Sequence, residues 1–167
     1  MFKRLLGNFY GIIRKLKGAP QAPAARPVDP RVAADPWLSA LLLDLGERYR
    51  IGEDAESGTQ LLRRTGRARF NPMRVWLRPG DRTVLGDYEV RAHDAAGVSL
   101  ARALLDARVT QALAGLGLSQ ASETVEEWAG QLLTRRYEGR CDDPRAAAAA
   151  VRFICEESEQ QLDTAAE

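Results

Sequence analysis

The sequence predicts an α+β fold in which a small antiparallel sheet packs with three helices. The sheet consists of a meander joined by a second hairpin. A detached N-terminal amphipathic helix and a Pro/Ala-rich linker precede this domain. Apolar residues recur at helical spacing after Asp35, Asp94 and Asp143, and the first and last of these can cap a helix. Between the first two of these helices, near residues 60–90, hydrophobic residues alternate with polar ones and turn residues separate the runs. Helices and strands therefore follow each other as helix, strands, helix, hairpin and helix.

The length of 167 residues, of which 45% are hydrophobic and 28% charged, suits one ordinary domain with an appendage. No repeat occurs at a fixed period. We expect a basic amphipathic helix over residues 1–18, a linker over 19–34, a single α+β domain over 35–162 and a polar C-terminal end over 163–167.

The first 18 residues are the strongest functional signal in the chain. At about 100° per residue, their apolar side chains fall within an arc of roughly 120° and their cations lie on the opposite side. Such a helix can lie in the headgroup region of an anionic membrane, with its apolar face toward the hydrocarbon. The same face could instead dock in a groove of a partner protein or on the chain's own domain. The predicted membrane- or partner-binding residues are Phe2, Lys3, Arg4, Leu5, Leu6, Phe9, Ile12, Ile13, Arg14, Lys15, Leu16 and Lys17.

The segment from residue 19 to residue 34 contains Pro20, Pro23, Pro27 and Pro30, with Pro36 just beyond. Proline fixes φ and lacks an amide donor, so such a segment resists helix and strand alike. It predicts a semi-rigid spacer between the basic helix and the domain.

The first helix of the domain should begin at Pro36, with Asp35 as its cap. The second follows Asp94 and ends near Gly115, and the third follows Asp143 and extends as far as Leu162. The first helix presents one apolar side to the core, formed by Trp37, Leu38, Leu41, Leu42, Leu45 and Tyr49.

Two strands are expected at residues 74–78 and 84–90, joined by a turn at Pro79 and Gly80, with Gly86 as a bulge in the second strand. A shorter strand within residues 60–70 completes the meander, after a loop over residues 52–58. Residues 124–139 are compatible with a helix or a hairpin, and we favour the hairpin because a sheet of two or three strands gains from further partners. Trp37 and Trp76 are expected in the core.

Charge is distributed unevenly, although the formal net charge is only +1. Every lysine lies in the N-terminal segment, and no acid precedes Asp29. A second basic run lies between Glu56 and Asp81, contains no acid and is interleaved with Phe70 and Trp76. It indicates an alternative function for the protein, the binding of nucleic acid or another anion. The candidate anion-binding residues are Arg63, Arg64, Arg67, Arg69, Arg74 and Arg78.

Residues that could carry catalysis are scarce. His93 is the only histidine, so a site with several histidine ligands cannot form, and no phosphate-binding glycine motif occurs. Cys141 and Cys155 match no metal-ligand spacing and each precedes acidic residues, which disfavours a thiolate. We therefore expect no catalytic residue, no cofactor and no metal site, with an enzyme of unrecognised motif as the remaining alternative.

These observations predict a non-enzymatic adaptor or accessory protein of the bacterial cytoplasm. It would attach to the inner face of a membrane, or to a membrane complex, through its N-terminal helix and present its domain to a protein partner. No apolar stretch approaches the roughly 18 residues that a transmembrane helix needs.

Overall fold

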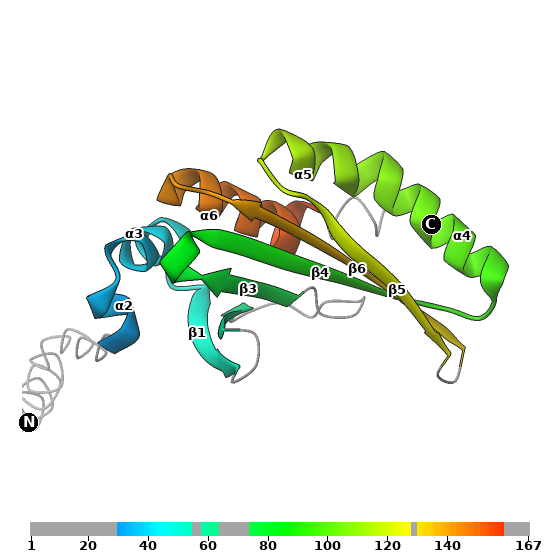
Figure 1. Ribbon diagram of the computed structural model, residues 1–167, viewed down its shortest axis with the longest axis horizontal. Coiled ribbons are helices and arrows are strands. Elements are labelled where there is room, and N and C mark those ends of the chain that lie inside the picture. Colours follow the sequence, from blue (N-terminus) through cyan, green and yellow to red (C-terminus); the bar gives the residue numbers. More distant parts are fainter. Residues whose placement is uncertain (1–29, 55–57, 64–73, 128–129, 159–167) are drawn as a thin grey trace, which may run out of the picture.

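The computed structural model describes residues 30–54, 58–63, 74–127 and 130–158, which form an antiparallel sheet with helices packed along one of its faces (Figure 1). The six-stranded sheet has the order β1-β2-β3-β4-β6-β5. Its strands are β1 (Tyr49–Asp54), β2 (Gly58–Arg63), β3 (Arg74–Arg78), β4 (Thr83–Ala92), β5 (Ser119–Glu127) and β6 (Gln131–Arg140). The α+β class predicted from the sequence is confirmed.

The longest pairing of the sheet joins β4 to β6 over their full lengths, from Thr83 opposite Arg140 to Ala92 opposite Gln131. β5 and β6 form the hairpin that was favoured for residues 124–139, and it begins earlier, at Ser119. The chain passes from β4 to this hairpin through the helices that cross the sheet.

Local caps fix where the helices begin. Asp35 accepts a hydrogen bond from the amide of Leu38 at 2.9 Å, at the start of α3 (Pro36–Leu45). Asp94 accepts one from the amide of Gly97 at 2.8 Å, at the start of α4 (Ala95–Leu105). Asp143 caps α6 (Pro144–Arg152) in the same way. The predicted caps Asp35 and Asp143 are confirmed, and Asp94, where the helix was predicted to start, is a cap as well. Each satisfies an amide that the first helical turn leaves without a partner.

Two of these helices continue through π-helical turns. α4 runs into η2 (Asp106–Thr110) and then α5 (Gln111–Gly115), so the helical segment spans the range predicted from its apolar stripe. α6 continues into η3 (Phe153–Glu157). The predicted extension of this helix to Leu162 lies outside the described residues.

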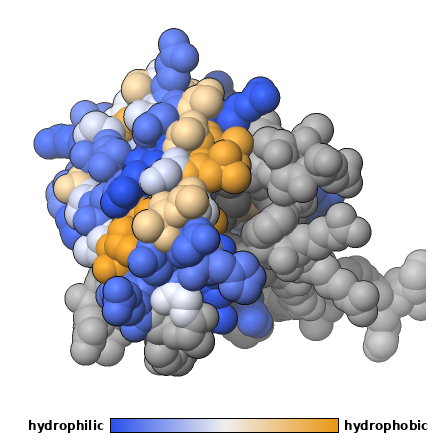
Figure 2. Space-filling model, turned by 90° about the vertical axis from the view of Figure 1, so that its right-hand side faces the viewer, coloured by the Kyte–Doolittle hydropathy of each residue, from blue (hydrophilic) through white to orange (hydrophobic). Residues whose placement is uncertain are grey.

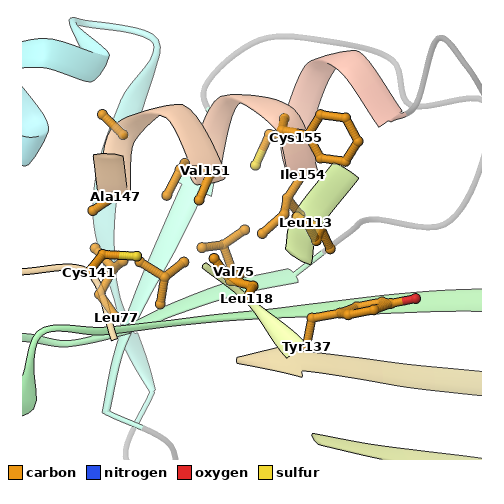
Figure 3. Packing of buried hydrophobic residues seen from close by; sticks show 14 of the residues in the cluster. Val75, Leu77, Leu113, Leu118, Tyr137, Cys141, Ala147, Val151, Ile154 and Cys155 are labelled. Atoms are coloured by element: carbon orange, nitrogen blue, oxygen red, sulfur yellow. The ribbon is translucent and has the colours of Figure 1, made fainter. Parts of the chain in front are cut away.

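The hydrophobic core lies between the helices and the sheet. Figure 3 shows Ala147, Val151 and Ile154 of α6 and η3 pointing toward Val75 and Leu77 of β3. α6 packs against both α3 and β4, and its small alanine side chains allow a close approach. Ile154 packs closely on Gly86 of β4, since a Cβ atom there would lie 2.7 Å from Cδ1 of Ile154 and the isoleucine would have to shift.

Three expectations for the N-terminal half are wrong. The first helix ends at Leu45, where Gly46 takes a φ of 75°, and Tyr49 opens β1 instead of extending the helix. The expected loop over residues 52–58 contains the end of β1 and the start of β2, which pair as a hairpin. Gly86 is in regular register opposite Val75 and Tyr137, so the expected bulge is absent there, and an irregularity occurs in β5 beside Ala121 instead.

A short helix, α2 (Pro30–Ala34), occupies the last five residues assigned to the linker. Its Val32 joins the core cluster. Residues 19–29 of the predicted linker lie outside the described residues.

Trp37 and Trp76 are both buried, but on different sides of the sheet. Trp37 belongs to the core cluster, as predicted, and its indole nitrogen donates a hydrogen bond of 2.9 Å to the carbonyl oxygen of Cys141. This bond connects α3 to Cys141, the residue that follows β6. Trp76 alternates with Val75 and Leu77 and so faces away from the helices, outside the core cluster.

Trp37→Ala should reduce the free energy of unfolding by about 3–5 kcal/mol, because it removes a large core side chain and leaves the Cys141 carbonyl without its donor. Leu43→Ala, on the exposed side of the same helix, is the control and should change it by less than about 0.5 kcal/mol. Chemical denaturation measures both, and similar losses in the two variants would contradict the placement of Trp37 in the core.

Candidate functional surfaces

The predicted membrane- or partner-binding residues of the N-terminal segment, Phe2 to Lys17, lie outside the described residues. Of the candidate anion-binding residues, Arg64, Arg67 and Arg69 also lie outside them. Arg63 is the last residue of β2. The structure therefore places only Arg74 and Arg78 of that set as side chains, and both are exposed at the ends of β3.

Arg74 and Arg78 share the sheet face opposite the helices with Trp76, because side chains alternate along a strand. Only 5% of Trp76 is exposed, and the guanidinium carbon of Arg136 lies 5.3 Å from its ring centroid. Stacking of a nucleic-acid base requires an accessible ring face. Trp76 does not provide one, so this part of the sheet lacks the aromatic platform of single-strand binders.

Arg136 is held beside Trp76 by Asp87. Its Nε and Nη2 donate to the two carboxylate oxygens of Asp87, both at 2.7 Å, in a bidentate pair across β4 and β6. The hydrogen bonds that Arg136 donates to Asp87 raise the pKa of Arg136 despite partial burial. A second pair, 3.6 Å long, joins Arg74 to Glu89. These carboxylates neutralise part of the arginine-rich face.

A second ionic cluster lies on the helix-covered face, around Arg135. Only 4% of the Arg135 side chain is exposed. Its guanidinium donates to Asp106 at 2.5 Å through Nη1, and to Glu123 at 2.8 Å through Nε and 2.7 Å through Nη2. Arg102 of α4 donates to the other oxygen of Glu123 at 2.6 Å. The cluster therefore connects α4 and η2 to both strands of the β5–β6 hairpin.

Tyr137 and Thr110 complete this cluster. Their hydroxyl oxygens lie 2.7 Å apart, and Thr110 also donates to the carbonyl oxygen of Leu105 at 3.3 Å, within the π-helical turn η2. Arg135 approaches the Tyr137 hydroxyl at 3.5 Å. The buried cation is thus surrounded by acceptors, which is the condition for keeping a charge inside a protein.

The charges of the cluster shift the affinity of its groups for protons. Burial favours the neutral form of Glu123, but the hydrogen bonds from Arg102 and Arg135 outweigh it and hold the pKa of Glu123 below its ordinary value. Burial likewise favours neutral Arg135, but hydrogen bonds to Tyr137, Glu123 and Asp106 raise its pKa. Both groups are therefore charged at neutral pH. The cluster acts as an internal clamp, because its ion pairs hold α4 and η2 on the β5–β6 hairpin.

The described residues contain no group of three or more histidine, cysteine and acidic side chains placed to hold a metal ion. His93 is exposed beside the cap of α4. Cys141 and Cys155 are buried and form no disulfide. Burial and then the neighbouring Asp142 raise the pKa of the Cys141 thiol, which disfavours its reactive thiolate.

Within the part of the chain that the structure describes, no helix is both long enough and apolar enough to cross a membrane. The fold is an α+β domain with an antiparallel sheet that carries helices on one face. Comparison with known protein families, with curated proteins and with solved structures finds no significant match.

The residues singled out from the sequence did not include Arg135, Arg136, Glu123 or Asp106. One signal was present for Arg135. It lies between Leu133 and Tyr137 at alternating positions, so a strand that buries these two residues also buries the arginine. Its acceptors could not be found in this way, because Asp106 comes from a helix whose position over the strand depends on the fold.

Glu123→Gln should lower the free energy of unfolding at pH 7 by about 2 kcal/mol, because buried Arg135 loses a charged hydrogen-bond partner. A carboxyl group whose pKa is lowered by folding stabilises the protein above its unfolded pKa, and this contribution disappears as the pH falls through the folded pKa. The difference between the two proteins should therefore shrink in acid. Denaturant titrations from pH 7 downward measure it.

Arg102→Ala is the control, because it removes the exposed partner of Glu123 and leaves Arg135 in place. It should cost less than about 1 kcal/mol. A difference between wild type and Glu123→Gln that grew toward acid would contradict the proposed clamp.

Proposed function

We propose that the protein is a non-enzymatic adaptor that attaches to an anionic membrane surface through residues 1–18 and presents its α+β domain to a protein partner. The observation that carries the proposal is the segregation of apolar and cationic side chains in this segment, which contains no acid. A bacterial cytoplasmic protein bound to the inner membrane face is the setting that this proposal implies.

The energetics favour reversible attachment. Each cation near an anionic surface contributes about 1 kcal/mol, so the five cations of the segment give at most about 5 kcal/mol before salt and entropy reduce it. The apolar arc is narrow and Gly7 and Gly11 interrupt the helix, so its burial is a modest anchor by itself. The two contributions together are sufficient for binding that can be reversed.

The proposal gives separate roles to the N-terminal segment and to the domain. Within the described residues, the core cluster is formed by residues from Val32 to Cys155, and Asp35 caps α3. In this proposal the domain relies on its own core, and the apolar face of the N-terminal segment is used at the membrane. The proline-containing segment between them supplies reach.

The full-length protein should sediment with vesicles that contain anionic lipid and much less with neutral vesicles, and a chain that lacks residues 1–18 should sediment with neither. Phe9→Asp should abolish binding at every salt concentration, because it places a charge in the apolar arc. Lys15→Glu combined with Lys17→Glu should weaken binding most at low salt, where charges act over distances longer than about 8 Å. If the protein ignored anionic vesicles, the membrane proposal would be wrong.

A chain that begins at Val32 should unfold cooperatively at the same temperature as the full-length protein, because it retains every described member of the core cluster. Calorimetry with and without residues 1–31 measures this. A decrease of several degrees would indicate that the N-terminal segment packs on the domain.

A further inference from the structure

Strand β5 forms one edge of the sheet. It pairs with β6, and among the residues that the structure describes no further strand lies beyond it. Nearly every residue of β5 is exposed, and the segment from Ser122 to Glu127 pairs with β6 without interruption. A strand of this kind offers a row of main-chain donors and acceptors to another extended chain.

Val125 provides an apolar contact at this edge. It lies opposite Leu133, which is fully buried beneath the helices, yet 39% of Val125 itself is exposed. The view in Figure 2 looks onto the end of the molecule where α4 and the β5–β6 hairpin meet, and it shows hydrophobic residues crossing this end between hydrophilic ones. An added strand would place a side chain beside Val125 and continue the layer under α4.

The charges of β5 restrict what can pair there. Glu123 is already bound by Arg102 and Arg135, but Glu126 and Glu127 are exposed and make no ion pair within the described residues. Antiparallel pairing of two copies that aligned Ser122 with Glu127 would place Glu123 opposite Glu126 twice. The irregularity at Ala121 prevents a longer pairing. These features oppose self-association and acidic partners and favour a cationic one.

We propose that β5 is the docking site for an extended, cationic segment of a partner protein, which joins the sheet as a further strand next to β5. Such a segment would carry an apolar residue at Val125 and a cation near Glu126, with its main chain bonded along residues 122–127. The inference deepens the proposed function, on which it rests for the existence of a protein partner, by naming the surface and the chemistry of that partner.

The test uses the full-length protein without lipid and a fluorescent nine-residue peptide of alternating lysine and valine. Fluorescence anisotropy should show saturable binding, whereas a peptide with glutamate in place of lysine should not bind. A lysine–valine peptide with an N-methyl group on every amide should also fail, because its main chain cannot donate to β5 from either edge. Glu126→Lys with Glu127→Lys should weaken binding by about tenfold or more at low salt, and Glu47→Lys, an exposed acid near β1, should not.

Hydrogen exchange on the unsubstituted protein gives a second measurement that does not depend on the folding of a variant. The peptide should slow exchange of amides in β5 and leave β1, the opposite edge of the sheet, unchanged. Equal binding of the lysine and glutamate peptides, protection at β1 instead of β5, or sedimentation of the free protein as a dimer paired through β5 would overturn the proposal.

The two proposals fail separately. Phe9→Asp should leave peptide binding intact, and Glu126→Lys with Glu127→Lys should leave binding to anionic vesicles no weaker than in the unsubstituted protein. A protein that bound vesicles but not the peptide would retain the membrane proposal alone.

Discussion

The structure depends on the pairing of β4 with β6. These strands are far apart in the sequence, and their full-length register joins the N-terminal meander to the C-terminal hairpin in one sheet. The helical segment α4–η2–α5 must cross one sheet face to make this connection, and α6 returns over the same face. The core cluster of the described residues consequently lies on the helix-covered face, so Val75 and Leu77 meet the helices, while Trp76 is buried on the opposite face.

The two ionic clusters follow from this arrangement, one on each face of β6. Arg135 points under the helices and is neutralised by Glu123 and Asp106, whereas Arg136 points to the opposite face and is held by Asp87. The neighbouring positions of these two arginines show how alternation along a strand separates their environments. The charges of Arg135 and Arg136 are neutralised within the domain. Glu126 and Glu127 of β5 make no ion pair within the described residues, so they distinguish this edge of the sheet.

Local features of the fold were predictable from the sequence, and features that depend on distant segments were not. The caps Asp35 and Asp143, and the start of a helix after Asp94, were predicted because a helix start depends only on the few residues that follow. Tyr49 was placed in a helix because it continues the apolar spacing, although Gly46 ends that helix first. The Arg135 cluster required knowledge of which helix lies over β6. The amphipathic pattern of the N-terminal segment, on which the proposed function rests, can be recognised in the sequence, but the segment lies outside the described residues.

The central claim is that the N-terminal segment binds membranes while the domain stands apart from them. Hydrogen exchange of the full-length protein with and without anionic vesicles tests it most directly, because both regions are observed in one experiment. The account predicts slower exchange in residues 1–18 on addition of vesicles and unchanged exchange in β4 and β6. Protection spread over the sheet, with none in residues 1–18, would contradict it.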